Sequence, residues 1–384
     1  MTTRRNFIKI IGGGAIVAAG AAVCITAFPP FLPDAAEAWH NPGAGETDIR
    51  RIALSYALLA PNPHNMQPWL VDLATPDTAI LSLDTERLLP ATDPFGRQII
   101  VGCGAFLELM VLAANAHGAD VRIKLWPLGE PDAHLDARPF ATVTFSEATP
   151  VKDPLFDHIL SRRTNREPYD PAHVPAADDL QAIVASGTSG TDLRGDFTNE
   201  PQPVAALRDI VWRGWTREMH TQAAVAESVK VMRIGDRAIA AHRDGLTLGG
   251  PLMNLLGATG IITREVLLDP DSSANAQGAV MWKEMADTAP AFIWIAGGDN
   301  TRTTQIAAGR AYARLNLAAA ARELSMHPWS MGLQEYPEMA DLYAEQQSQL
   351  GGTSAAPVQM LARIGYARAI PPAPRRGLEA LMKV

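Results

Sequence analysis

Cysteine is nearly absent from this 384-residue chain, which has only Cys24 and Cys103. Two thiols cannot form a disulfide framework or a thiolate metal site. An excess of positive charge is also missing, since 33 lysines and arginines stand against 41 aspartates and glutamates, for a net charge of −8. An acidic chain lacks the basic face that nucleic acid requires, so no nucleic-acid partner is expected. With 47% hydrophobic residues, the chain has the composition of a globular protein of one large or two ordinary domains.

The familiar catalytic signatures are missing as well. No G-x-G-x-x-G follows a strand, and there is no P-loop or G-x-S-x-G elbow. The histidines show neither H-x-x-x-H nor H-E-x-x-H spacing, so no metal site is expected. The acidic residues are scattered, with no pair marked for acid–base work. The sequence therefore names no catalytic side chain.

The N-terminal 38 residues are typical of an export signal. Arg4 and Arg5 precede Phe7 and Lys9, in the manner of a twin-arginine motif, and a Gly/Ala-rich apolar stretch follows. Ala36 to Ala38 fits an A-x-A cleavage site; an uncleaved membrane anchor is the alternative. We expect the twin-arginine export machinery as a partner, a periplasmic or exported product, and no stable membrane insertion after cleavage. Because this route carries folded proteins, often with a cofactor inserted beforehand, it favours a bound redox group.

The remaining chain predicts mixed helices and strands. Hydrophobic periodicity predicts long helices over 96–118 and 301–324, and strands over 69–73, 79–83, 121–125, 141–145, 291–296 and 360–366. Shorter helices are expected over 49–59, 153–161, 176–186 and 201–228. The Gly-interrupted segment 229–275 is interpreted as a lid or insertion. The two long helices resemble each other, which indicates an internal duplication.

Three short segments offer binding chemistry. Asn65 and Gln67 lie in a Pro-bounded turn before Trp69, where their amides could meet a heteroaromatic edge or a polyol; a helix-capping turn with Trp69 in the core is the alternative. Arg162, Arg163, Thr164 and Arg166 form a compact anion-binding pattern, or otherwise a solvated charged loop. The C-terminal pair Arg375 and Arg376 could add a second phosphate clamp, or be a basic tail.

Taken together, these segments resemble the nitroreductase superfamily of FMN proteins. The match is to its Asn-x-Gln-Pro-Trp turn, its Arg-Arg-(Ser/Thr)-x-Arg loop and its C-terminal arginine, with His327 to Gly332 similar to the flavin-facing loop. The order of the motifs fits the Acg-type branch, in which one chain holds two nitroreductase-like halves. The resemblance implies an α+β fold of two pseudo-symmetric halves that imitates the family homodimer, and a monomer. The boundaries are then 39–160 for the first half and 161–384 for the second.

The same resemblance implies FMN between the halves. Arg162, Arg163, Thr164, Arg166 and Arg376 would hold its phosphate. The remaining predicted cofactor contacts are Asn65, Gln67, Trp69, Ser330, Met331 and Gly332. The implied function is an exported FMN oxidoreductase that reduces a small-molecule electron acceptor of the nitroaromatic or quinone class, with a quinol or a protein as donor outside the cytoplasm. Two alternatives stay open: a protein that sequesters flavin without turnover, and a structural exported protein with no cofactor.

Overall fold

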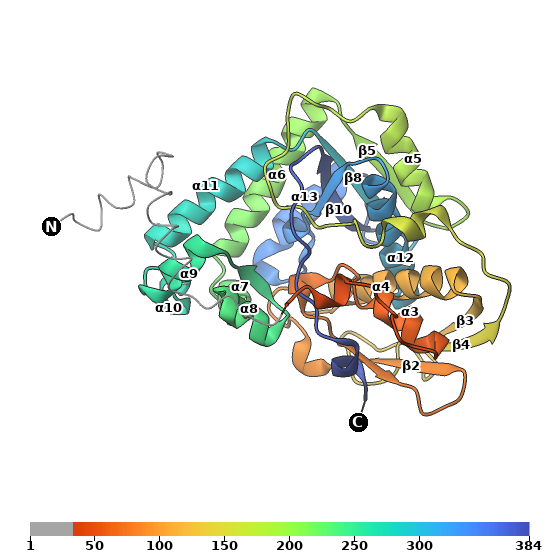
Figure 1. Ribbon diagram of the computed structural model, residues 1–384. Coiled ribbons are helices and arrows are strands. Elements are labelled where there is room, and N and C mark those ends of the chain that lie inside the picture. Colours follow the sequence, from red (N-terminus) through yellow and green to blue (C-terminus); the bar gives the residue numbers. More distant parts are fainter. Residues whose placement is uncertain (1–33, 384) are drawn as a thin grey trace.

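The computed structural model describes residues 34–383, in which two four-stranded antiparallel sheets flank a pair of long helices (Figure 1). Residues 1–33, with the twin-arginine motif, the apolar stretch and Cys24, lie outside the described residues. The α+β class and the two related halves are confirmed.

The strands are β1 (Trp69–Asp72), β2 (Thr78–Leu83), β3 (Ala119–Leu125), β4 (Ala141–Glu147), β5 (Arg194–Thr198), β6 (Met232–Ile234), β7 (Leu246–Leu248), β8 (Ala291–Ala296), β9 (Ser325–Pro328) and β10 (Val358–Gly365). The α-helices are α3 (Ile49–Ala57), α4 (Arg97–Ala116), α5 (Ala177–Thr188), α6 (Pro201–Met219), α7 (Gln222–Lys230), α8 (Asp236–His242), α9 (Pro251–Ala258), α10 (Arg264–Leu268), α11 (Ser273–Asp287), α12 (Arg302–Ala320) and α13 (Ala340–Gln349).

The two sheets repeat one topology. The first has the strand order β1-β2-β4-β3 and the second β5-β8-β10-β9, so each strand of one sheet has a counterpart in the other. In both halves a helix precedes the first strand, and a long helix connects the second strand to the edge strand. Trp126 to Gly129 follows β3, and Trp329 to Gly332 follows β9, each as Trp-x-x-Gly. The duplication indicated by the helices therefore extends through the whole of each sheet.

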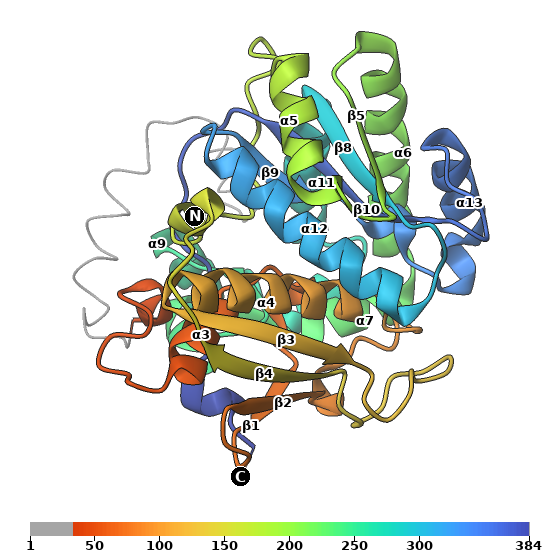
Figure 2. The ribbon, with the colours of Figure 1, turned by 90° about the vertical axis from the view of Figure 1, so that its right-hand side faces the viewer.

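The two long helices cross in the middle of the molecule. Figure 2 shows α4 and α12 lying between the sheets. Gly104 and Gly309 form the crossing, because a Cβ on Gly309 would lie 2.9 Å from the Gly104 Cα and 1.9 Å from the Val101 carbonyl oxygen. Among residues 34–383, α4 is the one helix long and apolar enough to span a membrane, yet 83% of its most apolar window is buried. The apolar residues of α4 therefore pack in the interior of the protein.

Two arginines tie the halves together reciprocally. Arg97, the first residue of α4, donates Nη1 to the Gln359 carbonyl at 2.6 Å and pairs with Glu335 at 3.0 Å, both in the second half. Arg302, the first residue of α12, donates Nη2 to the Asp132 and Ala133 carbonyls of the first half, at 3.0 Å each. Each long helix thus holds the loop that follows the other half's edge strand.

The predicted helix over 201–228 is two helices, α6 and α7, separated at His220 and Thr221. The predicted helix over 153–161 is a 3-10 turn, Pro154–His158. No strand was predicted at β5 or β9, which form the two edges of the second sheet. β9 ends in Pro328, which hides its extended character in the sequence.

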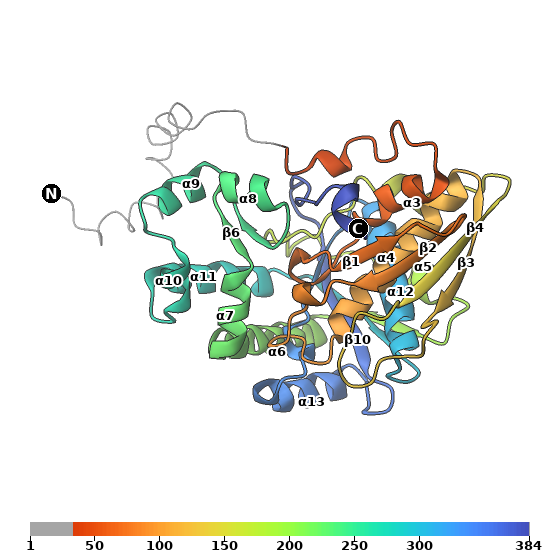
Figure 3. The same ribbon diagram turned by 90° about the horizontal axis from the view of Figure 1, so that it is seen from below.

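The segment 229–275 contains the short parallel pair β6–β7 and the helices α8, α9 and α10. Figure 3 shows this insertion on the side of the molecule away from β3 and β4. The C-terminal tail crosses back to the first half, where Lys383 donates its backbone N–H to the Val71 carbonyl at 2.8 Å. The tail thereby brings Arg375 and Arg376 close to the turn that holds Asn65 and Gln67.

Candidate functional site

The turn before β1 adopts an unusual backbone. His64, Asn65 and Gln67 have φ values of 45°, 53° and 50°, in the left-handed region that non-glycine residues rarely adopt. Asn62 stabilises the turn, because its Oδ1 accepts the Gln67 backbone N–H at 2.8 Å. Strained backbone of this kind gathers at functional sites, where the surrounding structure holds it in place.

The predicted amide side chains of this turn bind the C-terminal arginines. Asn65 Oδ1 accepts a hydrogen bond from Arg375 Nη1 at 2.7 Å, and its Nδ2 donates to the Pro374 carbonyl at 3.0 Å. Gln67 Oε1 accepts the Arg376 backbone N–H at 2.8 Å. Gln67 is fully buried, so both of its amide atoms are committed within the protein. The structure therefore joins the first and third sequence motifs.

Trp69 lies in the hydrophobic core. Its side chain has no exposed surface, and its ring centroid is 4.6 Å from that of Phe106 in α4. This is the alternative that the sequence left open for Trp69.

The arginine loop 162–166 lies beside β9 and the first half. Thr164 forms a parallel bridge with Met326, and the Asn165 backbone N–H donates to the Met326 carbonyl. Arg162 turns toward the first half, where its Nη2 donates to the Leu59 carbonyl at 3.0 Å. Arg375 Nη2 donates to the same carbonyl at 3.1 Å, so the second and third motifs also meet.

Five arginines of these three segments form no ion pair in the described part of the chain. Among residues 34–383, none of them forms an ion pair with a carboxylate, and their hydrogen bonds go to neutral oxygens. Several buried N–H groups bind nothing in this part of the chain, namely Nε and Nη1 of Arg162, Nε of Arg163 and Nε of Arg376. We call this set the arginine cluster: Arg162, Arg163, Arg166, Arg375 and Arg376. Buried unpaired charge is costly, so such a cluster is typical of an anion site.

The pKa values of the arginine cluster reflect this crowding. Burial lowers the pKa of Arg162 to about 10, and burial followed by repulsion from Arg162 and Arg163 lowers that of Arg375 to about 9. Burial also lowers the pKa of Arg166. The Arg166 side chain nevertheless has exposed surface, so protein atoms surround it while a small ligand can still reach it. His64 joins them: burial and then Arg166 lower its pKa to about 4, so the imidazole is neutral at pH 7.

Trp39 covers one side of the arginine cluster. It is 5% exposed, and its ring lies 4.8 Å from the guanidinium of Arg163, 5.4 Å from that of Arg375 and 5.7 Å from that of Arg162. Its Nε1 donates to the Ala373 carbonyl at 2.8 Å. A cation near an aromatic face gains on the order of 0.5–2 kcal/mol, which partly offsets the missing carboxylates.

The tip of the insertion lies on the Asn65–Gln67 turn. The Gly245 backbone N–H donates to the Asn65 carbonyl at 3.2 Å, and Gln67 Nε2 donates to the Arg243 carbonyl at 2.9 Å. Arg243 also pairs through its side chain with Glu37 at 2.9 Å. The segment interpreted as a lid therefore contacts the candidate site directly.

The structure places the predicted loop 330–332 at the start of α4. Ser330 Oγ lies 3.2 Å from Gln98 Oε1, and Gln98 Nε2 donates to the Ser330 carbonyl. Gly332 is buried beside Gln346, and Met331 packs against the core of the second half. The loop faces the first half, and none of its recorded hydrogen bonds involves the arginine cluster.

Several neighbours of the arginine cluster were absent from the predicted site. His64 directly precedes Asn65 in the turn but was given no role, whereas Arg375 was named with Arg376 as a candidate phosphate clamp. Trp39 directly follows the predicted cleavage site, and no motif around it indicates a ligand contact. Tyr312 lies near Arg162 and Arg166 and partly offsets the lowering of their pKa values by burial, but in the sequence it is one apolar position of a long helix.

No family model matches the chain. It is similar to Acg of Mycobacterium tuberculosis, with 31% identity over 223 residues that cover 53% of this chain and 62% of the relative, less than two thirds of that protein's length. A second relative from the same species, Rv3131, is 26% identical over 346 residues, 88% of this chain and 92% of its own. Both bear the provisional name NAD(P)H nitroreductase. The chain is therefore nitroreductase-like in sequence.

Among solved structures, the FMN-dependent nitroreductase NfnB from Mycobacterium smegmatis, in complex with NADPH, aligns with a TM-score of 0.37 and 18% identity. The alignment covers 59% of this chain and 96% of NfnB.

Proposed function

We propose that this chain binds FMN and acts as an oxidoreductase of nitroreductase type on small electrophiles of the nitroaromatic or quinone class. The observation that carries the proposal is the arginine cluster, in which four buried N–H groups, on Arg162, Arg163 and Arg376, have no protein acceptor among residues 34–383. A phosphate dianion supplies the missing charge and acceptor oxygens, since guanidinium groups bind phosphate in bidentate fashion. The names of the relatives support the same assignment.

Within this proposal each motif has a defined task. Arg162, Arg163, Arg166 and Arg376 hold the phosphate, while Asn65 and Gln67 position the C-terminal arginines through their recorded hydrogen bonds. The bound flavin supplies the hydride chemistry, and the protein supplies position and electrostatics. The insertion tip covers the Asn65–Gln67 turn and limits the access of water there. This division explains why the sequence shows no catalytic acid, base or nucleophile.

The test is FMN binding by a charge-deleted variant, Arg162→Gln. Losing a charged hydrogen bond costs about 1.5–3 kcal/mol, which weakens FMN binding by roughly 10- to 150-fold. The flavin-free variant should at the same time unfold at a higher temperature than flavin-free wild type, because an unpaired buried charge is gone. Arg213→Gln, which removes an exposed arginine paired with Glu345, is the matched control and should leave FMN affinity unchanged. Unchanged FMN affinity in Arg162→Gln would refute the phosphate site.

A flavin-sequestering protein without turnover is the second candidate. It is favoured by the hydrogen bonds from Arg243 and Gly245 to the turn, which close the site from one side. An anaerobic absorption spectrum of the FMN-loaded protein separates the two candidates. Bleaching by NADPH or NADH, reversed by a nitroaromatic or quinone, supports the enzyme. If the flavin stays oxidised after addition of NADPH, NADH or a quinol, the result supports sequestration.

We further propose export through the twin-arginine pathway, with a periplasmic product. The support is the Arg4-Arg5 pair, the apolar stretch after it and the Ala36 to Ala38 cleavage pattern. Nicotinamide nucleotides are scarce outside the cytoplasm, so the donor there would be a quinol or a protein. Replacing Arg4 and Arg5 by lysines should retain the protein in the cytoplasmic fraction. Equal periplasmic yield of this variant and the wild type would contradict the pathway.

A further inference from the structure

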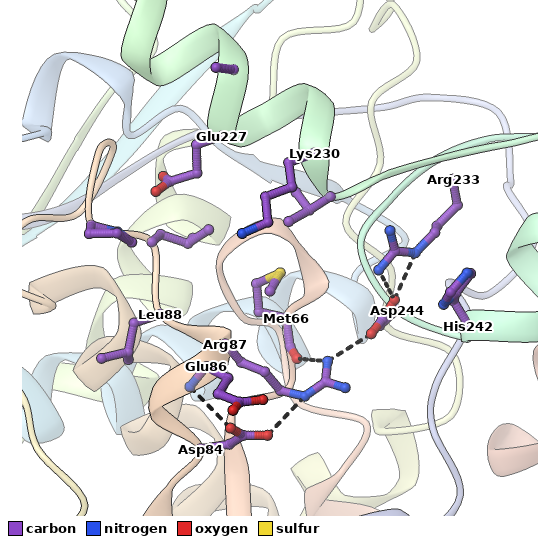
Figure 4. Close-up of a pocket in the computed structure, with 14 residues that line it drawn as sticks. Met66, Asp84, Glu86, Arg87, Leu88, Glu227, Lys230, Arg233, His242 and Asp244 are labelled. Carbon is purple, nitrogen blue, oxygen red and sulfur yellow. Dashed lines mark hydrogen bonds and ion pairs between the residues drawn. The ribbon is translucent and has the colours of Figure 1, made fainter. Parts of the chain in front are cut away.

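A pocket at the seam between the first half and the insertion has a volume of about 530 Å³ (Figure 4). Its first wall comes from Asp84 to Pro90 and from Met66 of the strained turn. Its second wall comes from the end of α7 and from the insertion, with Lys230, Arg233, His242 and Asp244. A volume of this size lies within the range of about 300–1,000 Å³ found for small-molecule sites.

Most charged groups of this seam pocket already have hydrogen-bond or ion-pair partners within the protein. Asp244 accepts from Arg87 and from Arg233, at 2.7 Å each, and Asp84 accepts from Arg87 at 3.1 Å. Glu227 accepts the backbone N–H groups of Ala91 and Thr92 and the Thr92 hydroxyl. These groups form the walls of the pocket, and few of their hydrogen-bonding positions remain available to a ligand.

Two charged side chains of opposite sign remain without any such partner among the described residues. Within residues 34–383, the Lys230 ammonium and the Glu86 carboxylate have neither a hydrogen bond nor an ion pair, and both side chains are exposed. In Figure 4 the Lys230 ammonium extends from α7 over the pocket, and the Glu86 carboxylate lies on the wall opposite α7, with Met66 between them in this view. Met66, Leu88, Leu89 and Val231 supply an apolar surface in the same pocket.

We propose that the seam pocket binds a short apolar peptide with free termini, of dipeptide size, whose carboxylate meets Lys230 and whose ammonium meets Glu86. A ligand with one charge of each sign would pair with both uncommitted groups, and its side chains would cover the apolar surface. The volume of the seam pocket is larger than one amino acid needs and can hold two. This site uses no residue of the arginine cluster, so it stands independently of the proposed flavin site.

The test is calorimetric titration of the full chain with leucyl-phenylalanine, its N-acetyl derivative, its C-terminal amide, and phenylalanine alone. Wild type should prefer the dipeptide over each derivative by about fivefold, a value suited to exposed ion pairs. Lys230→Met should abolish the preference for a free carboxylate and keep the preference for a free ammonium. Glu86→Gln should do the reverse. Tighter binding of phenylalanine than of the dipeptide would overturn the proposed ligand size.

Lys152→Met, which removes an exposed lysine paired with Asp157 outside the pocket, is the control and should behave as wild type. The proposal fails if the dipeptide does not bind, or if both pocket variants weaken all four ligands equally. Loss of FMN binding in the Arg162→Gln variant has no bearing on these affinities, so the two proposals fail separately.

Discussion

At the scale of single residues, Glu218 lies in a second group of buried polar atoms. It is 5% exposed and accepts one hydrogen bond from Gln334 Nε2 at 3.0 Å. The Ser228 hydroxyl, the Tyr336 hydroxyl and Gln334 Oε1 are buried and bind nothing in residues 34–383. Burial raises the pKa of Glu218 to about 7. The protonated carboxyl is therefore favoured in the folded protein at mildly acidic pH.

Glu218→Gln tests this environment through the pH dependence of stability. The folded pKa exceeds the unfolded value of about 4.3, so the native state binds the extra proton between these values, and wild-type stability falls as pH rises toward 7. We expect the variant to match wild type near pH 4.5 and to exceed it at pH 8, by about 3 kcal/mol at most. Thermal unfolding across this pH range measures the difference. Glu284→Gln, at an exposed position of α11, is the control and should show no such trend. A difference in stability between Glu218→Gln and wild type that stays constant across the pH range would contradict the argument.

At the scale of elements, the contact of α4 and α12 depends on two glycines. The Gly104 and Gly309 backbones approach so closely that neither position has room for a side chain. Next to the crossing, Glu108 of α4 pairs with Arg310 at 2.8 Å and Arg314 at 2.9 Å of α12. Close backbone approach and flanking ion pairs together set the angle between the halves, and with it the position of the arginine loop relative to the turn.

Gly309→Ala should destabilise the protein by about 3 kcal/mol, because its Cβ would lie 1.9 Å from the Val101 carbonyl oxygen and force the helices apart. Chemical denaturation measures the loss. Gly278→Ala is the matched control in α11, where nothing lies within 4 Å of the added Cβ. That variant should gain about 0.5–1 kcal/mol, as helical glycine-to-alanine changes do. Similar free energies of unfolding for the two variants would contradict the role given to the crossing.

At the scale of the whole molecule, the two halves repeat a topology but not a site. The second half supplies the arginine loop, and the first supplies the Asn65–Gln67 turn. By the pseudo-symmetry, the counterpart of the loop is the segment before α3, and residues 34–48 contain neither lysine nor arginine. The counterpart of the turn links α5 to β5, and residues 189–193 contain neither asparagine nor glutamine. The described part of the chain therefore builds one arginine cluster.

One FMN per chain is the expected stoichiometry. The ratio of flavin absorbance to protein concentration after reconstitution with excess FMN measures it, and Arg162→Gln and Arg376→Gln should each reduce the same single equivalent. A ratio of two would require a second anion site outside the arginine cluster, and would contradict the assignment by pseudo-symmetry.

Local patterns predicted much of the scaffold. The apolar run at Ala291–Ala296 and the periodicity of α4 and α12 are strong because these segments are buried almost throughout. β5 was missed because no residue in it is buried, so its sequence lacks an apolar pattern. The break between α6 and α7 was missed because Thr221 accommodates a helix start without glycine or proline. For the site, the three motifs were visible in the sequence, and the residues that join them were not.

By itself the sequence determined the mixed helix and strand content and the arginine-rich loop, because these depend on hydrophobic spacing and composition over a few residues. The likeness of the two long helices indicated the duplication, and the resemblance to the nitroreductase superfamily implied the α+β fold. Only the tertiary structure decided that Asn65 and Gln67 bind the C-terminal arginines, that Trp39 covers the arginine cluster and that the insertion tip lies on the turn. These contacts join residues more than 100 positions apart. Their partners are set by the way α4 and α12 bring the two halves together, and no local pattern records that packing.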